Sequence, residues 1–240
     1  MHSDYQSTNV SLLGLDGRAL SPLLVSSASA STALSTPLSG DVVLPTMPQA
    51  GSELLLLDRF PAAVLTWVDL RTGVPTGQLS VATGYKANPR DYVRVRDDKA
   101  YVSRFEPNLA AGSEPFDGGN DLLIVSPSSR AITGRIGMDS AMLGEDPALL
   151  PRADKMVLVG DWLYVLLGVY DQSFLSSAAS RLVSIDVRTD AIARVLRLER
   201  LHGCAGMALS PTASELAVAC SGKFGGDSLP TMSESAVVFV

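Results

Sequence analysis

Charged and aromatic side chains are scarce in this chain of 240 residues, where 18% of the residues are charged and 6% are aromatic. Charged residues make up about a quarter of an average globular chain. Disorder requires low hydrophobicity and high net charge, and is excluded because 46% of the residues are hydrophobic. Glu and Lys are too rare for a coiled coil. The formal net charge of −6 argues against a nucleic-acid partner or an anionic membrane surface.

Long apolar runs and targeting signals are also missing. No run approaches the roughly 20 apolar residues of a membrane-spanning helix, so we expect no membrane span. The chain starts Met1-His2-Ser3-Asp4, with neither a basic region nor an apolar segment, so no signal peptide is visible. Either the protein is cytosolic or a sorting sequence lies outside this chain.

The only two cysteines, Cys204 and Cys220, flank a stretch typical of two short strands around a turn at residues 211–214. A hairpin centred on this turn places Leu209 opposite Glu215 and Cys204 opposite Cys220. Opposed strand positions have Cβ atoms about 4.5–5.5 Å apart, close to disulfide geometry. We therefore expect a disulfide and, with it, an oxidising compartment. The alternative is two buried free thiols.

Internal repeats dominate the sequence. Two kinds of hairpin alternate along the chain, and together they form a unit of four strands, A to D, that recurs about every 50–60 residues. Four-stranded antiparallel units at this period indicate propeller blades rather than a sandwich. We therefore predict an all-β fold, a β-propeller of four-stranded antiparallel blades. The hairpins occupy residues 42–56, 66–81, 92–103, 123–138, 156–166, 183–198 and 207–219.

The repeats also divide the chain into parts. We assign residues 1–40 to an N-terminal hairpin and a Ser/Thr-rich loop of a partial blade, and residues 41–240 to propeller repeats. Because the repeats begin and end at a C strand, we expect about four blades in an incomplete ring. The alternative is a closed four-bladed ring. The blades are expected near residues 41–81, 91–138, 155–198 and 204–240.

Three segments carry a family resemblance: Leu-Ser-Pro-Thr-Ala-Ser-Glu-Leu-Ala-Val-Ala at 209–219, Val-Ser-Ile-Asp-Val-Arg-Thr-Asp at 183–190 and Trp-Val-Asp-Leu-Arg-Thr-Gly at 67–73. They resemble the repeats of YVTN-type, lactonase-like bacterial propellers over about residues 41–240, although the SPDG turn of those repeats is intact nowhere. The resemblance implies a propeller fold and, more weakly, hydrolysis of a lactone. The chain also resembles secreted or lipid-anchored bacterial propellers, which implies a periplasmic or extracellular protein with a lipid anchor in its full-length form.

The lengths of the connections indicate which face of the propeller carries the ligand-binding site. The B–C and D–A loops share one face and are long, whereas the A–B and C–D turns on the other face are mostly tight. Binding and catalysis usually lie on long loops that a rigid scaffold positions. We therefore expect the ligand on the face with the long loops. These loops are residues 83–91, 105–120, 139–155, 170–180, 199–204 and 221–235.

Equivalent charged residues precede the A strands, near the expected central channel. Arg90-Asp91 and Arg152-Ala-Asp154 occupy matching places, and His202 follows in the next repeat. Together they could bind an anionic ligand, or they could form a ring of salt bridges between blades. His202 is the only internal histidine, so any histidine general base must be this residue, although an ordinary loop residue is the alternative. His202 and Asp154 are the candidate catalytic residues.

One loop has the composition of a cation site. Asp117, Asn120 and Asp121 accompany two glycines, and their oxygens suit a hard divalent cation. The spacing is not that of an EF-hand, and the alternative is a Gly-rich turn with Asx hydrogen bonds. No other cofactor is expected.

Motifs for nucleophilic, nucleotide and zinc chemistry do not occur in the sequence. The leading hypothesis is therefore a non-catalytic, exported propeller that binds a protein, peptide or glycan through its long-loop face. The alternative is a lactonase-like hydrolase of a small ester or lactone, with a polar or metal-containing central channel. A third hypothesis is that this chain is only a structural part of a larger ring.

Overall fold

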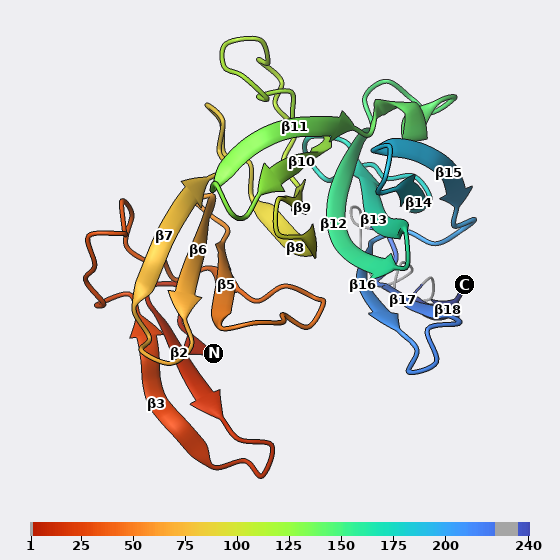
Figure 1. Ribbon diagram of the computed structural model, residues 1–240. Helices are drawn as coiled ribbons and strands as arrows, with labels where there is room; N and C mark the ends of the chain where they lie inside the picture. Colours follow the sequence, from red (N-terminus) through yellow and green to blue (C-terminus); the bar gives the residue numbers. More distant parts are fainter. Residues whose placement is uncertain (1, 224–234) are drawn as a thin grey trace.

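The computed structural model describes residues 2–223 and 235–240, which form five antiparallel sheets (Figure 1). The second, third and fourth sheets have four strands each, and the first and fifth have three. In this described part, a single 3-10 turn, η1 (Asp139–Met142), is the one helical element. The strands are β1 (His2–Ser3), β2 (Thr8–Leu13), β3 (Ala19–Ser26), β4 (Val42–Val43), β5 (Glu53–Asp58), β6 (Val64–Asp69), β7 (Pro75–Ser80), β8 (Pro89–Arg96), β9 (Lys99–Arg104), β10 (Asp121–Ser126), β11 (Ala131–Gly137), β12 (Leu150–Val159), β13 (Trp162–Tyr170), β14 (Arg181–Asp186), β15 (Ala191–Arg197), β16 (Cys204–Leu209), β17 (Leu216–Cys220) and β18 (Ala236–Phe239).

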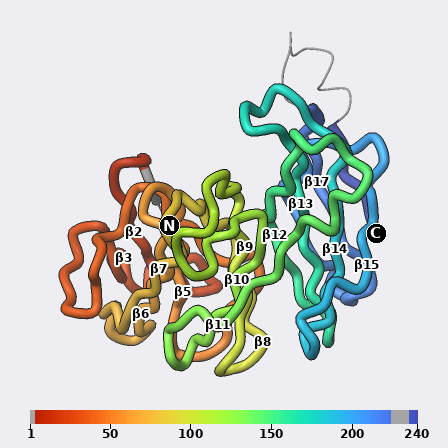
Figure 2. Tube along the Cα trace, turned by 90° about the horizontal axis from the view of Figure 1, so that it is seen from above, coloured from red at the N-terminus to blue at the C-terminus, as the bar shows by residue number. Residues whose placement is uncertain are grey.

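The sheets follow one another along an arc, seen from two directions in Figures 1 and 2. Strands within each sheet are hydrogen-bonded in sequence order, as in a propeller blade. The first strand of the fourth sheet, β12, contacts the first strands of both neighbouring sheets, β8 and β16. The described sheets do not close into a ring. The prediction of an all-β propeller with about four blades in an incomplete ring is confirmed.

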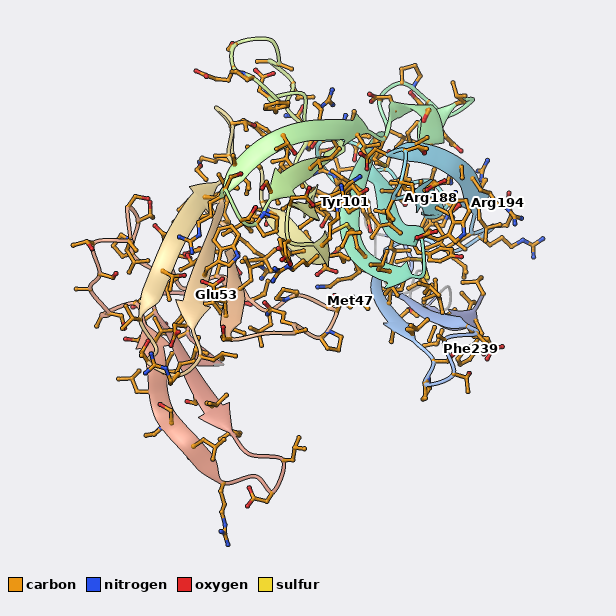
Figure 3. All side chains as sticks on the ribbon, in the orientation of Figure 1. Met47, Glu53, Tyr101, Arg188, Arg194 and Phe239 are labelled. Carbon is orange, nitrogen blue, oxygen red and sulfur yellow. A yellow bond between two sulfur atoms is a disulfide. The ribbon has the colours of Figure 1, made fainter. Side chains whose placement is uncertain are left out.

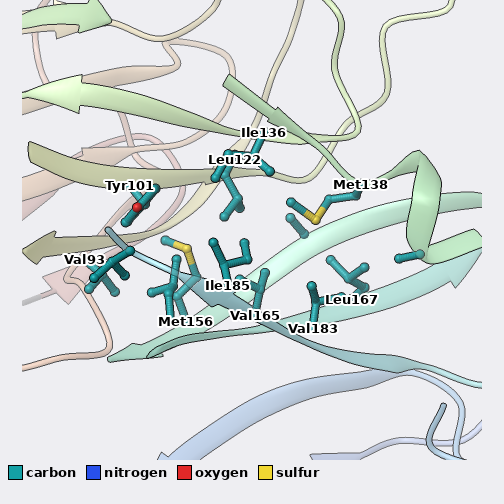
Figure 4. Close-up of a cluster of buried hydrophobic side chains, with 14 residues drawn as sticks. Val93, Tyr101, Leu122, Ile136, Met138, Met156, Val165, Leu167, Val183 and Ile185 are labelled. Carbon is teal, nitrogen blue, oxygen red and sulfur yellow. The ribbon is translucent and has the colours of Figure 1, made fainter. Parts of the chain in front are cut away.

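Apolar side chains between neighbouring sheets form the core. One cluster joins Tyr101 and Leu122 of the third sheet to Met156 and Val165 of the fourth (Figure 4), and all four side chains are fully buried. Because each inner sheet is covered on both faces, its middle strands read as continuous apolar runs instead of alternating ones. This packing explains the low charge of the chain, since polar residues are left mainly to loops and outer strands.

Backbone hydrogen bonds show how the connections divide between two faces. In the fourth sheet, the N–H of Val187 in the C–D turn donates to the carbonyl of Asp161 in the A–B turn at 3.0 Å. At the other end of the same strands, the N–H of Leu198 in the D–A loop donates to the carbonyl of Ser180 in the B–C loop at 2.9 Å. The A–B and C–D turns therefore lie on one face, and the B–C and D–A loops lie on the other. Residues 224–234, most of the last predicted loop, lie outside the described residues.

The second sheet reverses the pattern of loop lengths. Its A–B connection, residues 44–52, is long, and its B–C connection, residues 59–63, is short. The long connection carries Met47, which packs against the apolar clusters of the fourth and fifth sheets and is labelled beside β16 in Figure 3. Through Met47, this loop of the second sheet therefore contacts the fourth and fifth sheets, which lie further along the arc.

The fifth sheet contains the predicted disulfide, Cys204–Cys220, and the two cysteines are paired directly across β16 and β17. The predicted register of the hairpin was wrong by one residue, because Leu209 pairs with Leu216 and not with Glu215. The hydroxyl of Ser210 accepts the Glu215 N–H at 3.1 Å, which keeps Glu215 in the turn. A β-bulge between Cys204 and Gly206 then restores the cysteine pair.

A single buried carboxylate ties three sheets together. Asp91 of β8 accepts the N–H of Thr46, from the long loop of the second sheet, and the N–H of Met156, from β12, each at 2.8 Å. It also accepts the N–H of Tyr92 at 2.9 Å. Asp91 has no exposed surface, so water cannot replace these bonds.

Asp91→Ala should therefore lower the free energy of unfolding by about 2–4 kcal/mol, because buried N–H groups lose their acceptor. Urea unfolding followed by circular dichroism measures this loss. Asp97→Ala is the matched control, since the Asp97 side chain is 93% exposed and its loss should stay within about 0.5 kcal/mol. Equal stability of the two variants would contradict the role given to Asp91.

Candidate functional site

Equivalent β-bulges lie near the start of the first strand in each of the last three sheets. The register shifts between Pro89 and Asp91 in β8, between Ala153 and Met156 in β12, and next to Ala205 in β16. A bulge redirects the side chain of the extra residue, and bulges are common beside active sites. Here they place Arg90, Asp154 and Ala205 around a single cavity.

This cavity, the channel pocket, has a volume of about 410 Å³ and lies on the long-loop face. Its walls come from the bulges of β8, β12 and β16 and from the ends of β9 and β13 with the loops that follow them. The functional side chains in its lining are Arg90, Phe105, Glu106, Asp154, Tyr170 and Phe174.

Asp154 is the unusual group in the channel pocket. The residue is 7% exposed, it lines the cavity, and its carboxylate oxygens are not among the fully buried polar atoms that lack a partner. Burial raises the pKa of this carboxyl, and the positive charge of Arg90 acts in the opposite direction. The backbone carbonyl of Asp154 accepts the Ser103 hydroxyl at 2.6 Å, which fixes the bulge against β9.

Arg90 carries the positive charge of the pocket. Its guanidinium lies over the Phe105 ring, 4.3 Å from the ring centroid, and its Nε is buried with no hydrogen-bond partner among the described residues. Burial lowers the pKa of Arg90, and the charge of Asp154 opposes this effect. The two groups attract each other but stay more than 4.0 Å apart, beyond the distance of an ion pair.

Aromatic rings form one wall. Phe105 and Phe174 are stacked with centroids 6.3 Å apart, and Tyr170 lies against Phe174 at 5.4 Å with the rings tilted by 45°. Gly168 makes room for this arrangement, because a Cβ at that position would lie 2.6 Å from the Tyr170 ring. The sequence therefore needs glycine here for the wall to form.

Arg152, predicted to bind ligand, lies against the aromatic rings but outside the pocket lining, and it is 1% exposed. It forms an ion pair with Glu106 at 2.6 Å and lies over the Phe174 ring at 4.2 Å. Asp91 was also predicted to bind ligand, but its carboxylate instead accepts hydrogen bonds from backbone N–H groups of the neighbouring sheets. Of the predicted Arg/Asp pairs, the pocket thus brings together Arg90 and Asp154.

His202 faces a second, more open cavity of about 810 Å³ beside the channel pocket. Its Nδ1 lies 2.9 Å from the hydroxyl of Ser177, at hydrogen-bond distance. His202 and Asp154 therefore line separate cavities, and the structure does not bring the two candidate catalytic residues together.

Two of the three candidate cation ligands, Asp117 and Asp121, have other partners, whereas the Oδ1 of Asn120 is buried without a hydrogen-bond partner among the described residues. The Asp117 carboxylate accepts the N–H groups of Gly112, Ser113 and Glu114 at 2.8–3.0 Å, and these bonds hold its pKa low. Asp121 is fully buried and pairs with two arginines. Among the described residues no cluster of three His, Cys, Asp or Glu side chains could hold a metal ion. The arrangement matches the Gly-rich turn that was the alternative, and the cation site stays a prediction.

The aromatic lining was not predicted. Phe105 follows the last residue of β9, and Tyr170 is the last residue of β13, so both occupy the end of a B strand in consecutive repeats. They are not equivalent positions, however, because the strand pairing aligns Tyr101 with Tyr164 and therefore Phe105 with Gly168, so comparison of the repeats does not mark these two aromatic residues. Phe174 lies in a loop, and nothing in the repeat pattern marks it.

The chain is a β-propeller by comparison as well as by geometry. No family model and no curated protein matches it. A 6-phosphogluconolactonase-like protein from Bacteroides uniformis superposes on 98% of this chain and 68% of its own, with a TM-score of 0.56 and 13% identity. At this identity the likeness shows the fold alone, and the YVTN-type resemblance stays a prediction.

Two further solved structures match less well. The β-propeller domain of Cps50 (Swd1) from Myceliophteria thermophila has a TM-score of 0.47 and 15% identity over 71% of this chain and 46% of its own. The dihydro-heme d1 dehydrogenase NirN has a TM-score of 0.43 and 16% identity over 80% of this chain and 33% of its own. This chain thus spans a third to about half of these two proteins.

The buried charge of Asp154 gives a prediction about stability. A carboxyl whose pKa is raised on folding stabilises the protein while it is protonated, and that contribution is lost as the pH rises through the folded-state pKa. Asp154→Asn, which keeps the shape without the charge, should therefore raise the free energy of unfolding at pH 7 by about 0.5–2 kcal/mol. The gain should shrink as the pH falls toward the ordinary pKa of 3.8.

Urea unfolding at pH 7 and at pH 4 measures the difference. Asp117→Asn is the control of opposite sign, because Asp117 accepts backbone hydrogen bonds and its pKa is lowered by folding. It should destabilise the protein at pH 7. An Asp154→Asn variant less stable than the wild type at pH 7 would show that the carboxylate has a partner within the protein.

Proposed function

We propose that this chain is an exported propeller that binds a small ligand in the channel pocket. The observation that carries the proposal is Arg90, which lines the cavity together with Asp154 and whose Nε is buried without a hydrogen-bond partner among the described residues. Nearly all buried polar groups in native proteins have partners, and an exception requires an explanation. A ligand that accepts a hydrogen bond from Arg90 supplies it.

The shape and lining of the cavity support the same proposal. Small-molecule sites are mostly apolar clefts of about 300–1,000 Å³ with a few converging polar groups. The channel pocket has this size, and its lining combines three aromatic rings with the charged groups of Arg90 and Asp154. Because both charged residues sit in bulges of hydrogen-bonded strands, the site is held on rigid elements.

The compartment follows from the disulfide. Disulfides persist in oxidising environments and are rare in the cytosol. The Cys204–Cys220 bridge lines the pocket through Cys204, so an exported, periplasmic or extracellular protein would keep the site intact. In the described part of the chain no helix is long and apolar enough to cross a membrane. A lipid anchor, and a protein, peptide or glycan partner on the long-loop face, stay predictions.

Filling the pocket tests the proposal. Ala205 is exposed, lies in the bulge of β16 and lines the cavity, so Ala205→Trp should occupy the ligand space without disturbing a buried group. Ligand-observed NMR with a library of small metabolites should find compounds that bind the wild type. Their binding should weaken at least tenfold in Ala205→Trp.

Ala193→Trp is the matched control, because Ala193 is also an exposed strand alanine but lies on β15, outside the pocket lining. This variant should bind like the wild type. Hits that survive Ala205→Trp, or a library without hits, would count against the channel pocket as a binding site.

A second candidate function is hydrolysis of a small ester or lactone. The observation in its favour is the hydrogen bond between Ser177 Oγ and His202 Nδ1, since a serine within reach of a histidine is the core of an activated nucleophile. This pair lies in the more open cavity and not in the channel pocket. It would place the chemistry beside the binding site proposed above.

A panel of lactones and aryl esters tests this second function. If Ser177 is the nucleophile and His202 its base, Ser177→Ala and His202→Ala should each lower turnover by about 10²-fold or more. Ser173→Ala is the control, because Ser173 belongs to the same loop and bonds to Asp171 instead. Turnover that is absent in the wild type, or unaffected by both variants, would reject the hydrolase.

A further inference from the structure

The channel pocket presents one positive and one negative group that do not neutralise each other by contact. Arg90 and Asp154 both line the cavity, yet no nitrogen of Arg90 lies within 4.0 Å of the Asp154 carboxylate. The other two charges at the pocket are already paired, because Glu106 accepts from Arg152 at 2.6 Å. The lining thus offers a ligand one cation and one anion, held apart.

The capacities of these two groups define what the ligand must carry. An ionised Asp154 carboxylate only accepts hydrogen bonds, whereas the Arg90 guanidinium only donates them, and the Arg90 Nε is buried without a partner among the described residues. A simple anion would satisfy Arg90 and be repelled by Asp154. A simple cation would satisfy Asp154 and be repelled by Arg90. A molecule with an ammonium and a carboxylate on neighbouring atoms pairs with both at once.

The remaining lining excludes a polyhydroxyl ligand. Away from the charged groups the walls are mainly Phe105, Tyr170, Phe174, Gly168 and Cys204 of the disulfide, and Gly203, Ala205 and Ser221 complete the lining. Sugar hydroxyls placed there would lose their hydrogen bonds to water without replacement, which is unfavourable. The ring faces of Phe105 and Phe174 are also covered by Arg90 and Arg152, so they are not free to stack on a sugar. An alkyl or aryl group suits these walls.

We propose that the channel pocket binds a zwitterionic α-amino acid with an apolar side chain, its carboxylate on Arg90, its ammonium on Asp154 and its side chain against the aromatic wall. The proposal rests on the function proposed above and names the ligand class. The volume agrees, because a cavity of about 410 Å³ lies within the range of small-molecule sites and admits a molecule the size of leucine or phenylalanine.

Isothermal titration calorimetry of the oxidised protein with four probes tests the ligand class. The probes are L-phenylalanine, phenethylamine, which lacks the carboxylate, 3-phenylpropanoate, which lacks the ammonium, and glucose. L-phenylalanine should bind at least about tenfold more tightly than either analogue, because each loses one charged hydrogen-bonded pair. Glucose should not bind.

Two variants connect each end of the ligand to its residue. Asp154→Asn should remove the preference for L-phenylalanine over 3-phenylpropanoate and leave the preference over phenethylamine. Arg90→Gln should do the reverse, and Arg90→Lys, which keeps the charge, should retain part of the affinity lost in Arg90→Gln. Thermal unfolding of each variant shows that it is folded, and a crossed pattern is expected only if each residue contacts its own end of the ligand.

The results separate this inference from the function it rests on. Equal affinity for L-phenylalanine and both analogues, tighter binding of glucose, or no binding of L-phenylalanine would overturn the amino-acid proposal. The channel pocket would still be a binding site if another library compound lost affinity in Ala205→Trp. If no compound depends on Ala205→Trp, both proposals fail.

Discussion

The arrangement of the inner strands depends on one buried carboxylate. Asp91 binds backbone N–H groups of Thr46 and Met156, so it connects the second, third and fourth sheets at the centre of the arc. Burial raises the pKa of Asp91, and these hydrogen bonds act against that effect. The contact fixes β12 relative to β8, and the bulges that carry Arg90 and Asp154 lie on those two strands. The geometry of the pocket is therefore set by an interaction outside it.

Most of the fold could be predicted because the chain repeats its strand pattern. Hairpins, strand order and the disulfide follow from periodic apolar residues and turn residues, which are local signals. The register at Leu209 could not be predicted, because it depends on a bulge at Ala205 and on a turn that the Ser210 hydroxyl stabilises. The packing of Met47 against the fourth and fifth sheets could not be predicted either, since it is a contact between sheets that are distant in the sequence.

Less of the site could be predicted, and the reason is side-chain direction. Arg90 and Asp91 are adjacent, yet one lines the pocket and the other binds the neighbouring sheets, because Arg90 is the extra residue of a β-bulge, whereas Asp91 is paired in the ladder. Equivalent position in the repeat suggested Arg90 and Asp154, and both residues line the channel pocket. Position in the repeat gave no information on the partner of Arg152. Arg152 forms an ion pair with Glu106, from a loop of the preceding sheet, and such a pair depends on the three-dimensional contacts between blades.

The pairing of the other buried charges supports a functional reading of the pocket. Elsewhere the described structure pairs its buried arginines and lysine closely, at Arg104–Asp121, Lys99–Asp190 and Arg181–Glu145. Leaving a buried charge without a partner is costly, so a fold selected for stability alone would close the gap between Arg90 and Asp154 as it closes the others. The gap is instead maintained by rigid bulges on two separate sheets. This separation of the two charges occurs at the cavity where β8, β12 and β16 meet, which is the site proposed for the ligand.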